Sequence, residues 1–192
     1  MSAANTLAAT ALAVALGTTL MNATAAPALS ADNPFAREST LPYKWPPLDK
    51  IQNPHYVPAL EAGMAEQRKE VADIANNKAE PTFDNTIVAL ERSGQLLNRA
   101  STVFYALSSS HTNPDIEKAQ TEMAPKLSAH SDAIYLDAAL FARVKQLYAQ
   151  RQSLKLDPES LRLLERYHTN FVRAGANLSE VQKKELRALN EK

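Results

Sequence analysis

Residues 137–148 read DAALFARVKQLY. The apolar positions of this run recur three and four residues apart, which places them on one face of an α-helix. They are Leu140, Phe141, Val144, Leu147 and Tyr148. Asp137 precedes them at the position where an N-cap side chain accepts hydrogen bonds from the first helical turn. The stretch therefore predicts an amphipathic helix with one buried face.

The same helical spacing continues on both sides of this run. The expected inner faces are Val57, Leu60, Met64, Val71, Ile74 and Ala75; Phe83, Ile87, Leu90, Leu97 and Phe104; Ile116, Ala119, Met123, Leu127 and Ile134; Leu161, Leu164, Phe171 and Val172; and Val181, Leu186 and Leu189. No segment shows the period-two alternation that is typical of strands. The sequence predicts an all-α fold with about six helices in antiparallel hairpins.

Capping residues mark where these helices begin and end. The expected N-terminal signals are Asn53-Pro54, Pro81-Thr82, Asn113-Pro114, Asp137, Asp157-Pro158 and the pair Ser179 and Gln182. Gly94 weakens the middle of the second helix and allows a kink or a break there. Pro125 should kink the third helix, and Gly175 suits a left-handed end to the fifth.

Residues 26–52 form a segment of a different kind. Seven of the eleven prolines lie between Pro27 and Pro58, and proline favours extended backbone at its own position and at the residue before it. The segment also carries the large apolar side chains Phe35, Leu41, Tyr43, Trp45 and Leu48. These side chains would stay in water unless the segment lies across a surface. We therefore expect an ordered, extended N-terminal arm.

Residues 1–25 resemble a signal peptide. The first ionisable side chain is Asp32, and an apolar stretch runs into Ala23-Thr24-Ala25, an A-x-A cleavage signature. We expect cleavage after Ala25 and a periplasmic or otherwise exported protein. No Lys or Arg precedes the apolar stretch, so the start of translation could lie upstream, or the segment could be an Ala-rich tail of a cytoplasmic protein.

The composition excludes several classes of function. The chain has 192 residues, with 21 Lys and Arg against 21 Asp and Glu, and no cysteine. A net charge of zero argues against a nucleic acid or an anionic membrane as the main partner. Without cysteine there is no disulfide framework, no thiolate nucleophile and no cysteine-based metal site.

The histidines do not form a zinc-protease signature. The motif H-E-x-x-H is absent, and no second His or Glu lies four residues from His55, His111, His130 or His168. We expect His130 and His168 to be hydrogen-bonded interior or boundary residues. The sequence thus predicts no catalytic, cofactor-binding or metal-ligating residue in this chain.

Two other polar clusters also favour structural roles. Ser108-Ser109-Ser110 precedes His111, but hydroxyl groups at a helix end usually bond to backbone carbonyls or stabilise the turn. Glu61, Glu66 and Glu70 alternate with Arg68 and Lys69, as is typical of a solvated helix face.

Several motifs of the chain resemble one family. The strongest, residues 81–94, reads PTFDNTIVALERSG. The others are residues 39–43 (STLPY), 46–51 (PPLDKI), 124–127 (APKL), 132–136 (DAIYL) and 171–179 (FVRAGANLS). From about Asn33 to Lys192 the chain resembles the N-terminal region of the bacterial peptidyl-dipeptidases of the Dcp type. These belong with oligopeptidase A and thimet oligopeptidase among the helical zinc metallopeptidases.

The resemblance implies a much longer enzyme with a two-lobed helical fold split by a deep channel. In that family, two His of H-E-x-x-H and a later Glu in the second half bind zinc, and Dcp-like members release dipeptides from the C-termini of oligopeptides. None of those positions has a counterpart here. The resemblance places residues 53–192 in the distal lobe, as channel wall and access filter, and assigns zinc to the full-length enzyme only.

We therefore expect a truncated N-terminal portion of an exported Dcp-like zinc peptidase, inactive by itself. Its partners would be the missing C-terminal catalytic half and, through the full-length enzyme, oligopeptide substrates. We expect no nucleic acid, and no membrane after signal cleavage. Two alternatives stay open. The first is a free-standing, non-catalytic periplasmic helical module that binds peptides or a partner. The second is a helical bundle of unknown use that has inherited the family resemblance without the family's function.

Overall fold

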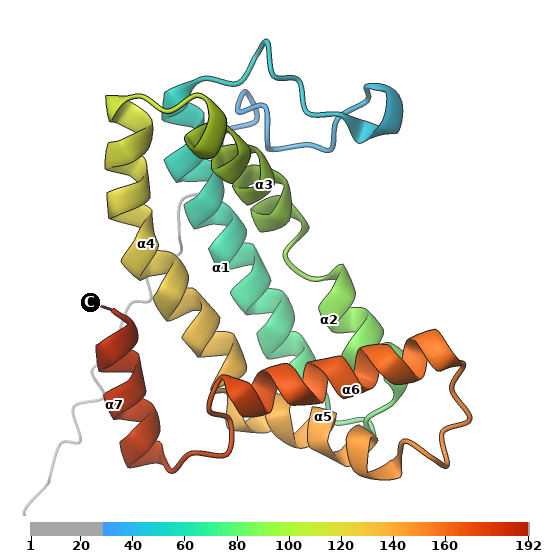
Figure 1. The fold of residues 1–192 in the computed structure, drawn as a ribbon. Helices are drawn as coiled ribbons and strands as arrows, with labels where there is room; N and C mark the ends of the chain where they lie inside the picture. Colours follow the sequence, from blue (N-terminus) through green and yellow to red (C-terminus); the bar gives the residue numbers. More distant parts are fainter. Residues whose placement is uncertain (1–28, 192) are drawn as a thin grey trace, which may run out of the picture.

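The computed structural model describes residues 29–191, whose regular elements are all helices and which contain no strand, so the predicted all-α fold is confirmed (Figure 1). The helices are α1 (Tyr56–Ala75), α2 (Ala89–Arg92), α3 (Gln95–Ser110), α4 (Pro114–Tyr135), α5 (Ala138–Gln150), α6 (Pro158–Arg173) and α7 (Glu180–Asn190). Shorter turns are the 3-10 helices η1 (Pro42–Lys44) and η2 (Asn53–His55) and the π-helical η3 (Phe83–Val88). The expected signal peptide lies outside the described residues.

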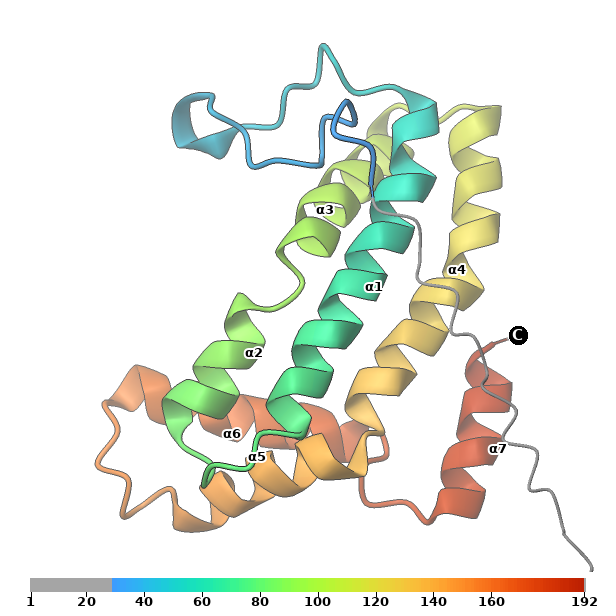
Figure 2. The ribbon, with the colours of Figure 1, turned by 180° about the vertical axis from the view of Figure 1, so that it is seen from behind.

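The helices form two groups. α1 packs between α3, which runs in the opposite direction, and the first half of α4, which runs in the same direction, whereas α5 and α6 cross the lower end of α1 (Figures 1 and 2). α7 runs beside the second half of α4. The segment before η2 covers the upper end of the molecule and projects beyond α3.

α1 packs most extensively against α3, and Gly63 makes this close approach possible. A Cβ atom at Gly63 would lie 2.6 Å from the backbone nitrogen of Leu97 and 2.7 Å from its Cα. Glycine in the middle of a helix costs about 1 kcal/mol relative to alanine. Here that cost is offset by the packing of one helix directly on the backbone of another.

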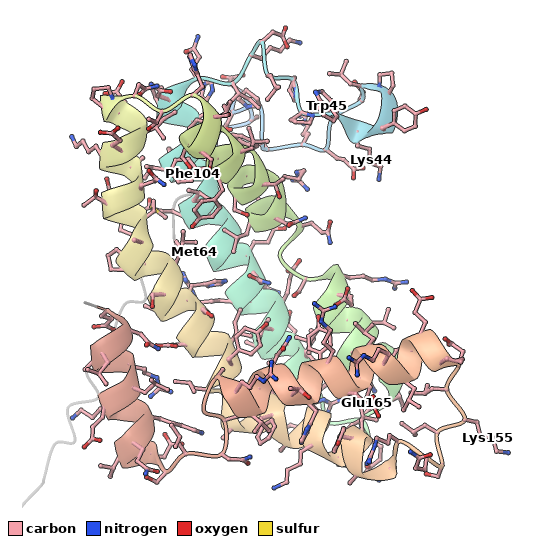
Figure 3. All side chains as sticks on the ribbon, in the orientation of Figure 1. Lys44, Trp45, Met64, Phe104, Lys155 and Glu165 are labelled. Atoms are coloured by element: carbon pink, nitrogen blue, oxygen red, sulfur yellow. The ribbon has the colours of Figure 1, made fainter. Side chains whose placement is uncertain are left out.

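Two hydrophobic clusters form the core, and α1 contributes to both. The first cluster, which contains Met64 and Phe104 (Figure 3), consists of Phe35, Tyr56, Ala59, Leu60, Met64, Leu96, Ala100, Val103, Phe104, Ile116, Ala119 and Met123. The second consists of Val71, Ile74, Ile87, Leu90, Leu140, Phe141, Val144, Leu147, Leu164, Phe171 and Ala176. Most of these residues belong to the predicted inner faces.

Polar groups separate the two clusters at the middle of α1. Gln67 and Glu70 lie between Met64 of the first cluster and Val71 of the second. Opposite them, the predicted second helix is interrupted at Gly94, whose φ is 70°. The Gly94 N–H, at the start of α3, donates to the Glu70 carboxylate at 2.7 Å. Glu70 was predicted to be solvated, but it supplies the acceptor that this N–H lacks within the helix. The break anticipated at Gly94 therefore divides the second helix into two pieces.

The predicted caps are confirmed at most helix starts. The side chains of Asn113, Asp137, Asp157 and Ser179 all accept backbone N–H groups of the turn that follows. Asn53 is the exception. Its amide donates to Asn113 and Asp115, 3.1 and 3.3 Å away, and α1 begins only at Tyr56, after the η2 turn.

Proline and glycine act on the later helices as expected. α4 continues through Pro125 but changes direction near its middle, which is where Pro125 lies in its range (Figures 1 and 2). Gly175 has a φ of 101° just after the end of α6, as the sequence predicted.

The expectation that the arm buries its apolar side chains is wrong for most of them. Phe35 is buried and its ring contacts Tyr56, with centroids 5.7 Å apart. Tyr43 is fully exposed, Trp45 is 63% exposed, and Leu41 and Leu48 are also exposed. The reason is that this part of the arm projects beyond the helices, as the labelled Trp45 shows (Figure 3).

The apolar stripe predicted for α7 is also largely unburied. Val181 is 70% and Leu189 is 64% exposed. Polar contacts attach the helix to α4 instead: the Asn190 amide donates to both oxygens of Asp132 at 2.9 and 3.0 Å, and the Ser128 hydroxyl donates to the Asn190 carbonyl at 2.8 Å.

The close approach of α1 and α3 is tested by Gly63→Ala. In an isolated helix this change is favourable by about 1 kcal/mol. Here the added methyl group meets backbone atoms of Leu97, which cannot move aside as a side chain can, so the overpacking cost lies in the upper part of the usual range, at about 2–3 kcal/mol. We expect a net loss of about 1–2 kcal/mol in the free energy of unfolding, measured by urea denaturation.

Glu66→Ala is the matched control, because Glu66 is an exposed residue of the same helix. We expect its effect to stay within about 0.5 kcal/mol. A Gly63→Ala protein as stable as the wild type would contradict the packing argument.

Candidate functional site

The histidines of the chain lie on different elements. His55 ends η2 and accepts the backbone N–H of Gln52 at 3.0 Å, and His111 is exposed after α3. His130 lies on α4 and His168 on α6. Between Leu29 and Glu191, no group of three or more His, Asp or Glu side chains is arranged to hold a metal ion.

His168 occupies the predicted boundary position but stacks on a neighbour, whereas we expected a hydrogen bond. Its ring lies 3.8 Å from that of Tyr148, with 6° between the planes. The Arg151 guanidinium lies 4.1 Å from the same tyrosine ring. Burial, and then the charges of Arg151 and Lys145, lower the pKa of His168 and favour the neutral imidazole.

The serine run has the structural role that the sequence predicted. The hydroxyl groups of Ser108 and Ser109 donate to the Tyr105 carbonyl, and Ser110 donates to Ala106, at 2.7–3.1 Å. Each hydroxyl thus bonds back to a carbonyl of the preceding turn of α3.

A cavity of about 740 Å³ lies between the start of the arm, α1 and α4. Lys126 reaches Glu61 at 2.6 Å and Glu122 at 2.9 Å beside it, so Glu61 is an ion-pair partner as well as a surface residue. The cavity wall carries Asp32 and Glu61 but also Arg68 and Lys126. Because these charges balance, the cavity selects no particular ligand charge.

A more selective site lies between α6 and the break that separates α2 from α3. Two cavities of about 210 and 430 Å³ share Gln67, Leu90, Ser93 and Tyr167, and we call them together the seam groove. The inner cavity is also lined by Val71, His130, Ser131, Ile134, Tyr135 and Phe171. The outer cavity is also lined by Glu91, Gly94, Gln95, Leu97, Asn98 and Ser101.

Tyr167 and Glu91 form the outer edge of the seam groove. The Tyr167 hydroxyl donates to Glu91 Oε1 at 2.5 Å. Burial, followed by this hydrogen bond to a carboxylate, raises the pKa of the Tyr167 phenol. The phenol therefore remains a donor and the carboxylate remains an acceptor.

His130 lies at the inner end of the groove and is only 6% exposed. Its Nε2 lies 2.7 Å from Gln67 Oε1, which can only accept, so Nε2 carries the proton. The other ring nitrogen, Nδ1, is buried and has no hydrogen-bond partner among the described residues. Burial, and then the charge of Arg68, lower the pKa of His130 to about 4.

Comparison with known proteins identifies the relatives of this chain. Dipeptidyl carboxypeptidase of Escherichia coli (strain K12) is 46% identical over 158 residues. The chain is homologous to part of the dipeptidyl carboxypeptidases. The match covers 82% of this chain but only 23% of the relative, and dipeptidyl carboxypeptidase of Salmonella typhimurium gives the same values. The chain thus spans about a quarter of the length of these enzymes, and the family resemblance seen in the sequence is confirmed.

Homology to the dipeptidyl carboxypeptidases includes residues that form the groove. The strongest motif, residues 81–94, folds into η3, α2 and the break, and its Leu90, Glu91 and Ser93 line the seam groove. No family model matches the chain. None of the helices from α1 to α7 combines the length and the apolarity needed to cross a bilayer.

Sequence analysis did not identify the seam groove, although one signal was present. Leu60, Met64, Val71 and Ile74 follow the stripe of α1, and Gln67 occupies the position between them where another apolar residue would fit. A polar residue inside an apolar stripe often marks a buried polar contact. Arg143 gives the same signal on α5, where it is buried and donates to Asn77, Ala79 and Asn85.

His130 makes stability depend on pH. Its folded pKa of about 4 lies below the ordinary value of 6.5, so the unfolded chain binds the proton more readily. The free energy of unfolding is therefore highest above pH 6.5 and decreases as the pH falls to about 4, because proton uptake favours the unfolded chain. The free energy of unfolding of the wild-type chain should therefore fall by about 3 kcal/mol across this range. We expect this fall to be absent in His130→Gln, as measured by urea denaturation at each pH.

His111→Gln is the control for this measurement, since His111 is exposed at the end of α3. We expect its pH profile to follow the wild type. If His130→Gln also followed the wild type, His130 would not be the group responsible.

Proposed function

We propose that this chain is the N-terminal portion of an exported peptidyl-dipeptidase, in which it forms a wall of the substrate channel. The main support for this proposal is the 46% identity to dipeptidyl carboxypeptidase over 82% of the chain. The chain covers only 23% of that relative, and its described residues offer no donor set for zinc. Under this proposal the zinc site and the hydrolytic chemistry belong to the remaining part of the enzyme.

The exposed apolar side chains support contact with that remaining part. They occur on the arm at Tyr43 and Trp45 and on α7 at Val181 and Leu189. Large apolar groups of this kind, gathered on particular segments, are typical of surfaces that a partner covers. The arm and α7 would therefore contact the catalytic part, and the helices between them would restrict entry to narrow, unfolded peptides.

Export is the part of the proposal that rests on sequence alone. The uncharged apolar stretch before Asp32 and the Ala23-Thr24-Ala25 signature support a cleaved signal peptide. The alternative is a cytoplasmic protein that keeps its Ala-rich N-terminus.

A non-catalytic peptide-binding module is a second candidate. The two hydrophobic clusters are closed within the described residues, which favours a chain that folds by itself. The seam groove would then be its binding site.

A chimera tests the first proposal. Residues 29–191 replace the homologous quarter of the Escherichia coli dipeptidyl carboxypeptidase, and release of C-terminal dipeptides from an oligopeptide is measured by mass spectrometry. We expect the chimera to be active, and the 192-residue chain alone to be inactive with or without zinc. A folded but inactive chimera, or zinc-dependent hydrolysis by the chain alone, would overturn the proposal.

The exposed surface gives a second prediction. We expect the isolated chain to bind the dye ANS and to self-associate in sedimentation, because its apolar side chains lack their partner. Trp45→Ser combined with Leu189→Ser should reduce both effects and change the stability by no more than about 0.5 kcal/mol per substitution, since both residues are exposed. A monomeric wild-type chain that binds no dye would argue for the self-contained module.

A further inference from the structure

Four hydrogen-bond donors that line the seam groove are already used within the protein. The Ser93 hydroxyl donates to the Leu90 carbonyl at 2.8 Å, and the Gln67 amide donates to Ser93 Oγ at 3.4 Å. The Gly94 N–H is bonded to Glu70, and the Tyr167 hydroxyl is bonded to Glu91. These four groups therefore offer no free donor to a ligand.

Acceptors, in contrast, remain open. Tyr167 is the only hydrogen-bond partner of the Glu91 carboxylate among residues 29–191, and a carboxylate can accept about four hydrogen bonds. His130 Nδ1 also lacks a hydrogen-bond partner in the described chain, since the ring proton is on Nε2, but this atom is buried. Both side chains line the groove, one at each end.

The charge of the groove points in the same direction. Glu91 is negative, and no Lys or Arg is among the described residues that line either cavity. His130 stays neutral under ordinary conditions, since its pKa is lowered to about 4. A cation with several N–H groups therefore matches the groove in both charge and hydrogen bonding.

The apolar lining of the inner cavity favours a ligand that carries an apolar group next to the cation. The inner cavity of about 210 Å³ has an apolar wall made by Val71, Leu90, Ile134 and Phe171. An aliphatic side chain next to the cation would bury apolar surface there.

We propose that the seam groove binds the amino terminus of an oligopeptide, with the ammonium group at Glu91 and the first, aliphatic side chain in the inner cavity. The proposal rests on the proposed function only in taking an oligopeptide as the ligand. It assigns to this chain the end of the peptide opposite to the one at which a carboxypeptidase cleaves, so the groove would hold the substrate by its far end.

The test is a titration of the ¹⁵N-labelled 192-residue chain with Leu-Ala-Ala-Ala, followed by NMR. We expect shifts of the amide signals of Ser93, Gly94 and Tyr167, and about tenfold weaker binding after N-acetylation, which removes the charge. Glu91→Gln should weaken binding of the free peptide to a similar degree. Glu66→Gln, a change of the same type at an exposed position of α1, should leave binding unchanged.

Three outcomes would overturn the assignment: equal binding of the free and the acetylated peptide, equal binding by the Glu91→Gln and Glu66→Gln proteins, or no shifts at the groove. If an acetylated Lys-Ala-Ala-Ala bound as tightly as Leu-Ala-Ala-Ala, the groove would be assigned to a lysine side chain instead. The comparison of peptides uses the wild-type chain, so it does not depend on whether a variant folds. An active chimera without these binding effects would refute this inference and leave the proposed function intact.

Discussion

The close contact of α1 with α3 at Gly63 is the constraint on which the rest of the structure depends. Because Gly63 has no side chain, the backbone of Leu97 can lie directly on α1. This approach encloses the first hydrophobic cluster, and α1 then continues past it to supply Val71 and Ile74 to the second. One helix therefore connects both cores, and α5 packs against its end and against α6.

The polar seam follows from this arrangement. A helix that serves two cores must pass between them, and here it does so at Gln67 and Glu70. The break of the second helix lies at the same level because Glu70 bonds the Gly94 N–H. The Gly94 N–H, which a continuous helix would satisfy internally, is satisfied by the Glu70 carboxylate from α1. The space left beside the break is the seam groove, so the groove results from the way the two cores meet.

The surface of the chain has two characters that match its relationship to a longer enzyme. The arm and α7 present large apolar side chains to solvent, and under the proposed function these side chains would pack on the catalytic part of the enzyme. The outer cavity of the seam groove is instead lined mostly by polar side chains. An apolar surface that joins parts of a protein and a polar groove that binds a ligand can coexist because they occupy different elements of the fold.

Local sequence determined the helices, most of their caps, the break at Gly94 and the family, since these depend on side-chain spacing and on contacts within a few residues. It did not determine which apolar side chains are buried: Tyr43 and Trp45 of the arm, and Val181 and Leu189 of α7, follow buried-type patterns and are exposed. Burial depends on whether another element lies opposite a residue. For the same reason, the roles of Gln67, Arg143 and Glu91 emerged only from the tertiary structure, because each role requires a partner more than 50 residues away in the chain.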